Sequence, residues 1–252
     1  MIQIHDLDEV GLIRESAQIV GQCLEMLARE VRPGVSTLAL DRLAEAFIRD
    51  AGGEPAFKGY RGFPASLCAS INEEVVHGIP SAKRILREGD IVSLDIGAKR
   101  QGFYGDAART CPVGEVSSTA ARLLEVTQTA LNAGIAQAKP GNRVSDISAA
   151  IEREVTRHRF KVVRALVGHG IGRELHEEPQ VPNYGRMGEG PKLKEGMVLA
   201  IEPMVNAGTA EVLTLSDQWT VVTADRGLSA HFEHTVAIGA DGPIILSKVE
   251  AD

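Results

Sequence analysis

The chain has 252 residues, of which 44% are hydrophobic and 24% are charged, and its formal net charge is −7. The length allows one large domain or two small ones, and the negative charge argues against general binding of nucleic acid or of an anionic membrane surface. The chain start has no secretion signal, no apolar run is long enough to span a bilayer, and three scattered cysteines fit a reducing compartment, so we expect a cytoplasmic protein.

The first part of the chain predicts two helices followed by strands. Asp6, with Glu9 three residues later, gives the first helix a capping-box start, and its apolar pattern ends at residues 32–34, Arg-Pro-Gly. A second helix is expected over residues 37–50, before two glycines. Short β-type runs then follow, and the expected strands are 69–72, 91–95 and 102–104.

The second part predicts the same order of elements. Helices are expected from Ser118 and over residues 144–157. The expected strands that follow are 162–167, 197–202, 219–223 and 231–238. Helices and strands do not alternate strictly, which favours an α+β fold with antiparallel strands and helices on one face. No Pro/Ser-rich linker divides the chain, so we expect a single domain over residues 1–252.

An internal repeat relates the two parts. Residues 86–95 return as residues 193–202 at an offset of 107 positions, and the copies end in Asp95 and Glu202. The helices agree at the same offset, which indicates a duplication with halves of roughly 1–112 and 113–252. A carboxylate that closes a buried apolar run is unfavourable unless something pairs with it. We therefore expect the halves to offer these acids to one shared site.

Four carboxylates and one imidazole lie in apolar or glycine-rich surroundings: Asp95, Asp106, His169, Glu202 and Glu233. Oxygen and nitrogen donors without sulfur are typical of a hard to borderline divalent ion. Four carboxylates are too many for one catalytic zinc ion but suit two ions, which activate water for hydrolysis of an amide or a phosphoester. A single acid at a strand end is more often a surface or turn residue, so the prediction depends on the whole set.

In its motifs the chain resembles the methionine aminopeptidases of type I, a family of dinuclear metallopeptidases. The stretches that carry the resemblance are residues 59–64, 70–73, 77–80, 168–172, 176–179 and 201–204. The resemblance extends from the first helix to about Ile245. It implies the pita-bread fold, in which pseudo-twofold halves form a curved antiparallel sheet covered by helices on one face.

The resemblance also implies a role for individual residues. The five residues named above would bind two divalent ions, for which Co, Mn, Fe and Zn are all compatible. Glu202 would also be the general base, His176 would polarise the scissile carbonyl, and His77 would hydrogen-bond the peptide beyond the cleaved bond. The pocket for the methionine side chain would be lined by Tyr60, Phe63, Cys68, Leu175 and Trp219, with Phe57 at its edge.

The implied activity is removal of the initiator methionine from nascent polypeptides, with a preference for small residues after the methionine. The implied enzyme is a cytoplasmic monomer that acts on polypeptide N-termini, with the ribosome as a place of action, and recognises neither nucleic acid nor membrane. The chain departs from many relatives at Phe57, Ala107 and Leu175, where they carry Cys, a hydroxyl residue and Phe. These departures change the shape of the pocket and one contact near the predicted metal ligands.

Three alternatives stay open at this point. A proline-directed relative, such as aminopeptidase P or prolidase, shares the fold and the metals but usually has an additional N-terminal domain. A metal-free homologue that binds RNA or ribosomes would have lost ligands, whereas all five are present here. A duplicate paralogue with weak activity is not distinguished by the sequence.

Overall fold

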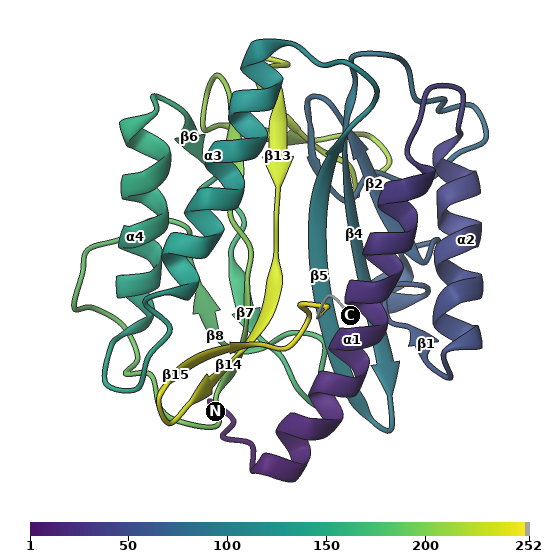
Figure 1. Cartoon of the computed structure of the whole chain (residues 1–252). Coiled ribbons are helices and arrows are strands. Elements are labelled where there is room, and N and C mark those ends of the chain that lie inside the picture. The colour runs from purple at the N-terminus through teal and green to yellow at the C-terminus, as the bar shows by residue number, and fades with distance from the viewer. Residues whose placement is uncertain (250–252) are drawn as a thin grey trace.

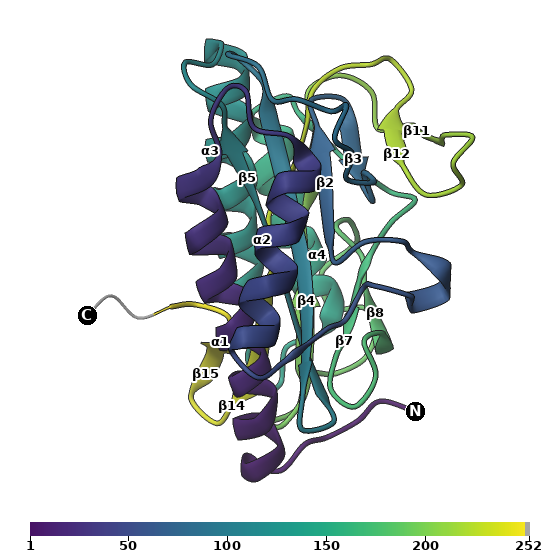
Figure 2. The ribbon, with the colours of Figure 1, turned by 90° about the vertical axis from the view of Figure 1, so that its right-hand side faces the viewer.

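Within residues 1–249, four α-helices cover one side of a curved set of antiparallel strands (Figure 1, Figure 2). The helices are α1 (Leu7–Glu30), α2 (Thr37–Asp50), α3 (Ser118–Ile135) and α4 (Val144–Arg157). This computed structural model describes residues 1–249, so the last three residues of the predicted domain 1–252 lie outside the described residues. None of the helices within 1–249 has the length and apolar content needed to cross a membrane.

The helices α1, α2 and α3 begin where the sequence supplies a capping side chain. The Asp6 carboxylate accepts a hydrogen bond from the N–H of Glu9 at 2.9 Å, as the sequence predicted. Ser36 and Ser117 cap α2 and α3 in the same way, each at 3.2 Å. Such caps satisfy N–H groups that have no partner in the first turn of a helix. The helix starts are therefore fixed by local chemistry.

The sequence repeat corresponds to a repeat of local structure. α2 and α4 have the same length of 14 residues and start 107 positions apart (144 − 37). The isolated bridge before α2, Ser36–Ile85, recurs before α4 as Arg143–Lys192. In Figure 1 the pair α1 and α2 lies beside the pair α3 and α4, with strands between and behind them.

In the part of the chain that the structure describes, the strands form four sheets in which every pairing is antiparallel. The first half supplies β1 (Glu54–Pro55), β2 (Leu67–Ile71), β4 (Ile91–Arg100) and β5 (Phe103–Pro112). The second half supplies a five-stranded sheet of β7 (Gly168–Gly170), β8 (Glu177–Val181), β9 (Val198–Ile201), β14 (His234–Gly239) and β15 (Gly242–Ile245). The predicted α+β class with helices on one face is confirmed.

Two three-stranded sheets complete the structure. One consists of β6 (Lys161–Val162), β10 (Met204–Asn206) and β13 (Ser229–His231). The other joins β3 (Glu74–Val76) of the first half to β11 (Val212–Thr214) and β12 (Val221–Thr223). This second sheet extends to one side of the molecule in Figure 2. A short 3-10 turn, η1 (Tyr60–Gly62), precedes β2.

Four strand predictions differ from the structure. The expected strand 102–104 continues to Pro112 as β5, and only residue 162 of the expected strand 162–167 lies in a strand, β6. The other two are the expected strands 91–95 and 231–238. β4 does not end at Asp95 but continues to Arg100, because β5 pairs with it over its whole length, so the acid lies in mid-strand. The predicted strand 231–238 is two strands, with Glu233 in the break. The N–H of Glu233 donates a hydrogen bond to the carbonyl of Ala108 at 2.9 Å, so the chain leaves one sheet here and then enters another.

Apolar side chains fill the space between helices and strands in each half. The cluster under α1 and α2 includes Leu27 and Leu40 together with Leu94 of β4. The cluster under α3 and α4 includes Leu123 and Ile151. Burial of this kind contributes roughly 25 cal/mol per Å² of apolar surface. The helices thus stabilise the strands from one side, and the opposite side carries the pocket described next.

Candidate metal centre and substrate pocket

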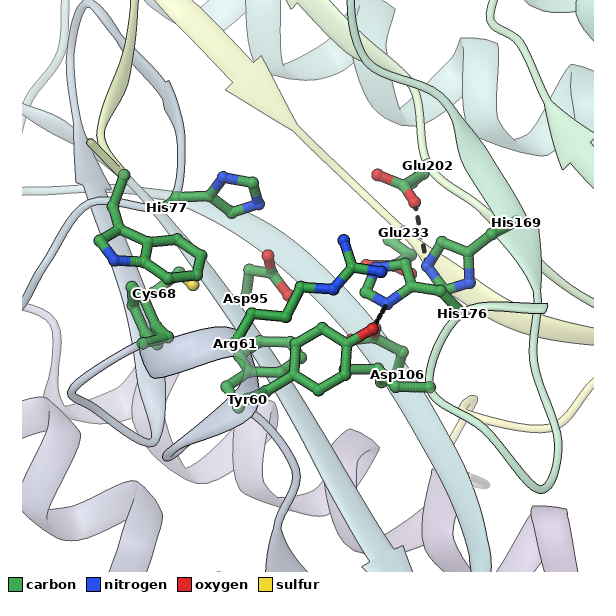
Figure 3. Close-up of a pocket in the computed structure, with 14 residues that line it drawn as sticks. Tyr60, Arg61, Cys68, His77, Asp95, Asp106, His169, His176, Glu202 and Glu233 are labelled. Atoms are coloured by element: carbon green, nitrogen blue, oxygen red, sulfur yellow. Dashed lines mark hydrogen bonds and ion pairs between the residues drawn. The ribbon is translucent and has the colours of Figure 1, made fainter. Parts of the chain in front are cut away.

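One pocket contains every residue that the sequence predicted as metal-binding, catalytic or substrate-binding (Figure 3). It is lined by Phe57, Tyr60, Arg61, Phe63, Cys68, His77, Asp95, Asp106, His169, Leu175, His176, Glu202, Trp219 and Glu233. These residues come from both halves of the chain. The structure therefore brings the predicted site together, while the role of each residue stays a prediction.

The first half supplies two carboxylates from neighbouring strands. In the antiparallel pair β4 and β5, Asp95 lies opposite Ala108 and Asp106 lies opposite Gly97. The two acids are therefore diagonal neighbours, and side chains two positions apart along a strand point to the same face. Cys68 of β2 lies opposite Asp95 and lines the same pocket.

The second half supplies the other three donors. His169 of β7 pairs with Ala200 of β9, and Glu202 follows the end of β9. Thr235 fastens the two halves at this point, because its hydroxyl accepts a hydrogen bond from the N–H of Asp106 at 3.0 Å and donates one to the carbonyl of Asp106 at 2.6 Å. These two hydrogen bonds from one side chain join the second half to the backbone of Asp106 in the first.

The donor atoms converge closely enough for a cation. Asp106, His169 and Glu233 each offer one atom within 4.8 Å of the others, and Nε2 of His169 is 3.4 Å from Oε1 of Glu202. Among the described residues, one oxygen each of Asp95, Asp106 and Glu233 is buried without a hydrogen-bond partner. Buried polar atoms of this kind are unfavourable unless a partner is supplied. Divalent metal ions fit this donor set.

The pKa shifts of the cluster also favour a bound cation. Burial raises the pKa of Asp95 to about 7, and burial followed by the repulsion of neighbouring carboxylates raises the pKa of Asp106, Glu202 and Glu233 well above the usual value. Four carboxylates buried next to one another do not all ionise unless a positive charge is nearby. Burial also lowers the pKa of His169 to about 4, which keeps the imidazole neutral.

His169 is oriented as a ligand. Its Nδ1 lies 2.9 Å from the carbonyl oxygen of Gly170, which can only accept a hydrogen bond, so Nδ1 carries the proton. The unprotonated Nε2 then faces Glu202. A backbone carbonyl that fixes the tautomer of an imidazole is a common support for a metal-binding histidine.

Two further histidines flank the opening of the pocket on opposite sides (Figure 3). Nδ1 of His176 lies 2.9 Å from the hydroxyl of Tyr60, and loss of hydration in the pocket together with His169 lowers the pKa of His176 to about 3. Burial also lowers the pKa of His77, whose backbone has a positive φ of 60°. A residue other than glycine is strained in the left-handed backbone conformation, and such strain often marks a functional position.

One wall of the pocket is apolar. The rings of Phe63 and Trp219 meet edge to face with centroids 5.1 Å apart, and Trp219 also meets His77 edge to face. Burial, followed by nearby carboxylates, raises the pKa of the Cys68 thiol well above its usual value, so it stays neutral. A pocket with one apolar wall and a few convergent polar groups suits an apolar side chain next to a reacting polar group.

Sequence reasoning missed His231. It is 1% exposed, its Nε2 lies 3.7 Å from Oε2 of Glu202, and neither ring nitrogen has a hydrogen-bond partner among the described residues. Burial lowers its pKa to about 3, so the ring is neutral. The signal was its position two residues before Glu233, because side chains two apart in extended chain share a face. Arg61 was also missed as a residue of the pocket.

Known proteins resemble this chain over nearly its whole length. A sequence profile described as Metallopeptidase family M24 matches residues 11–240. A methionine aminopeptidase of Clostridium acetobutylicum is 55% identical over 250 residues, 99% of this chain and 100% of that protein. Methionine aminopeptidase 1 of Bacillus subtilis is 54% identical, over 96% of this chain and 97% of that protein.

Solved structures give the same result for the fold. The methionine aminopeptidase of Thermotoga maritima superposes with a TM-score of 0.98 at 44% identity, covering 99% of this chain and 100% of that one. The prolidase of Pyrococcus horikoshii superposes with a TM-score of 0.80 at 24% identity, covering 98% of this chain and 64% of that one, which shows a shared fold alone. The predicted pita-bread fold is confirmed.

Proposed function

The chain belongs to metallopeptidase family M24 as a type I methionine aminopeptidase, a metal-dependent hydrolase, and on this premise we propose that it removes the initiator methionine from nascent polypeptides. The observation that carries the proposal is the pocket itself, in which a buried cluster of acids and one histidine lies beside an apolar wall. The cluster suits the reacting peptide bond, and the wall suits the methionine side chain.

We assign two divalent ions, of Fe, Mn, Co or Zn, to five ligands: Asp95, Asp106, His169, Glu202 and Glu233. The convergence of three of their donor atoms and the buried oxygens without partners support this assignment. When bound, such ions lower the pKa of a water molecule and polarise a carbonyl group. The remaining chemistry belongs to the protein.

Three side chains move or hold protons in this proposal. Glu202 accepts the proton of the attacking water, and its partly exposed carboxylate (13% exposed) is accessible from the pocket. His176 donates a hydrogen bond from Nε2 to the scissile carbonyl oxygen, since Nδ1 is held by Tyr60. His77, on the other side of the opening, hydrogen-bonds the peptide beyond the cleaved bond and helps to protonate the departing amine, which takes the proton that Glu202 has accepted.

The substrate class follows from the apolar wall. The apolar part of the pocket suits a flexible thioether. It is lined by Tyr60, Phe63, Cys68 and Trp219. The residue after the methionine would lie between His77 and His176, where a small side chain fits best. We therefore propose a preference for small residues at that position. We also propose that the enzyme is a monomer that works in the cytoplasm, with the ribosome as a place of action.

Peptide hydrolysis tests the proposal directly. Purified protein is incubated with Met-Ala-Ser, Met-Leu-Ser and Leu-Pro-Ser in the presence of Mn, Fe, Co or Zn, with and without chelator. We expect free methionine from Met-Ala-Ser, little from Met-Leu-Ser, and none with chelator. Bound metal without cleavage of any peptide would contradict the proposal, and cleavage only before proline would indicate the proline-directed alternative.

A further inference from the structure

Arg61 is the only Lys or Arg among the described residues that line the pocket. Its exposed side chain reaches across the opening, and Figure 3 shows the guanidinium group beside the ring of His176. The guanidinium carbon lies 5.3 Å from the centroid of the Tyr60 ring. The ring supports one face of the group, and the N–H groups at its edge stay available for a ligand.

Several exposed arginines of the chain are already paired with a carboxylate, whereas Arg61 is not paired with one among the described residues. Arg164 pairs with Glu152 at 2.6 Å, and Arg173 pairs with Glu9 at 2.6 Å. Within residues 1–249, Arg61 has no ion pair with a carboxylate. A guanidinium at the opening of a peptide-binding pocket is thus free to pair with a carboxylate that arrives with the substrate.

The backbone around Arg61 is held in an unusual conformation. Its φ of 50° and ψ of 22° are left-handed, and the flanking Gly59 and Gly62 have φ of 87° and 91°. The turn is closed by the N–H of Gly59 donating to the carbonyl of Phe63 at 2.8 Å. A strained residue persists only when its surroundings determine its conformation. The turn therefore presents the arginine side chain over the opening from a fixed base.

We propose that Arg61 determines specificity by binding an acidic side chain on the third residue of the substrate. The inference rests on the proposed function, in which the methionine side chain lies against the apolar wall of the pocket and a small second residue lies between His77 and His176. The third residue is then the first whose side chain lies outside the pocket, about 3.3 Å further along an extended peptide. Asp or Glu at that position meets the guanidinium, and Lys meets a like charge.

Matched peptides test this inference. The substrates are Met-Ala-Asp-Gly, Met-Ala-Asn-Gly and Met-Ala-Lys-Gly, each with an amidated C-terminus so that only the third residue changes the charge. For the protein as it stands we expect kcat/KM to be about threefold to tenfold higher for the Asp peptide than for the Lys peptide at low salt. Near 1 M salt the ratio should approach one, because the screening length is then about 3 Å.

Substitutions at Arg61 supply the decisive comparison. Arg61→Gln should bring the Asp/Lys ratio to about one, and Arg61→Glu should invert it. The Asn peptide serves as the internal control, since a folded variant still cleaves it. An equal loss for all three peptides would mean that Arg61 binds the peptide backbone, and an unchanged ratio would mean that it does not contact the third residue. Either result overturns the inference.

Arg164→Gln is the matched control variant. It changes the net charge by the same amount, and its side chain is 55% exposed and does not line the pocket. We expect it to leave the Asp/Lys ratio unchanged; an equal fall in the ratio would show an effect of total charge and overturn the inference. If the unaltered protein releases methionine without distinguishing the three peptides, the inference alone fails. If it releases methionine from none of them, the proposed function fails as well.

Discussion

The hydroxyl of Tyr60 lies 2.9 Å from Nδ1 of His176, and their rings stack with centroids 5.3 Å apart. A phenol that donates to Nδ1 leaves the neutral imidazole with its proton on Nε2, the tautomer that can donate a hydrogen bond to a carbonyl oxygen. Tyr60 therefore orients His176 in addition to lining the apolar wall.

Tyr60→Phe should lower kcat and leave KM within about twofold. The substitution keeps the ring and removes one hydrogen bond, whose typical net value of about 1 kcal/mol corresponds to a loss of roughly threefold to tenfold. The measurement is steady-state hydrolysis of Met-Ala-Ser, together with ¹⁵N NMR shifts that report the tautomer of His176. Tyr104→Phe, outside the pocket, is the control. An unchanged tautomer in Tyr60→Phe would contradict this role.

The sequence repeat marks two residues of the site, and the family resemblance supplied the substrate-side residues. Asp95 and Glu202 occupy equivalent positions at an offset of 107. An acid that recurs at the same place in both copies of an apolar run indicates a shared site even without a structure. The wrong end predicted for β4 did not affect this result. An acid that faces a pocket from mid-strand and one that ends a strand leave the same pattern of apolar neighbours.

The contacts that refine the site were not predictable from the sequence. Tyr60 and His176 are 116 positions apart, and nothing in the periodicity of either segment indicates that they meet. His231 approaches Glu202 because the chain passes from one sheet to another at Glu233. The sequence predicted one continuous strand here and so did not show this change of sheet. Arg61 depends on a left-handed turn that its two glycines permit but do not specify.

Glu202→Gln should reduce kcat by about 10² to 10⁴ because the amide cannot accept the proton of the attacking water. One oxygen remains, so we expect weakened rather than abolished metal binding. Hydrolysis rates and metal content per chain are measured on the same sample. Glu125→Gln, an exposed residue of α3, should change neither. Activity within a few-fold of the unaltered protein would contradict the assignment of Glu202 as base.

Gly105→Ala should destabilise the protein by about 1–3 kcal/mol. A Cβ atom at this position would lie 2.4 Å from the backbone nitrogen of Ala17, so α1 would have to move away from β5. Gly11→Ala is the matched control, because it lies on the exposed side of α1 with nothing within 4 Å of its Cβ. The control should stabilise by about 0.5–1 kcal/mol. Urea denaturation measures both; equal effects would contradict the packing argument.

The cysteines should resist modification in the folded state. Burial raises the pKa of Cys23 to about 12 and, with smaller effects of neighbours, that of Cys111 to about 11. At pH 8 the reactive thiolate of Cys23 is then about a thousandfold rarer than in an exposed thiol, whose ordinary pKa is 9.0. We expect no reaction with a thiol reagent at pH 8 in the folded protein and three reactive thiols after denaturation in guanidinium. Rapid labelling of the folded protein would contradict the burial.

Metal binding should release protons, and more of them at pH 6 than at pH 8. In the metal-free protein Asp95, with a pKa raised to about 7, is mostly protonated at pH 6 and mostly ionised at pH 8. Burial, followed by the repulsion of neighbouring carboxylates, also raises the pKa of Asp106, Glu202 and Glu233, which favours their protonated forms in the metal-free protein. A divalent ion binds the ionised forms and so displaces these protons. Titration calorimetry in buffers of different ionisation enthalpy counts them.

The same shifts set the sign of the stability change with pH. A carboxyl whose folded-state pKa is raised contributes stability below its unfolded pKa near 4, and this contribution is lost as the pH rises through the folded-state value. Through Asp95, the metal-free protein should therefore lose stability between about pH 4 and pH 7, and added metal should restore it. Asp95→Asn should remove part of both the slope and the proton release, while Asp241→Asn, an exposed substitution outside the pocket, should change neither. Metal binding without proton release at pH 6 would show that the cluster is already ionised, and the proposed metal centre would then need another source of charge compensation.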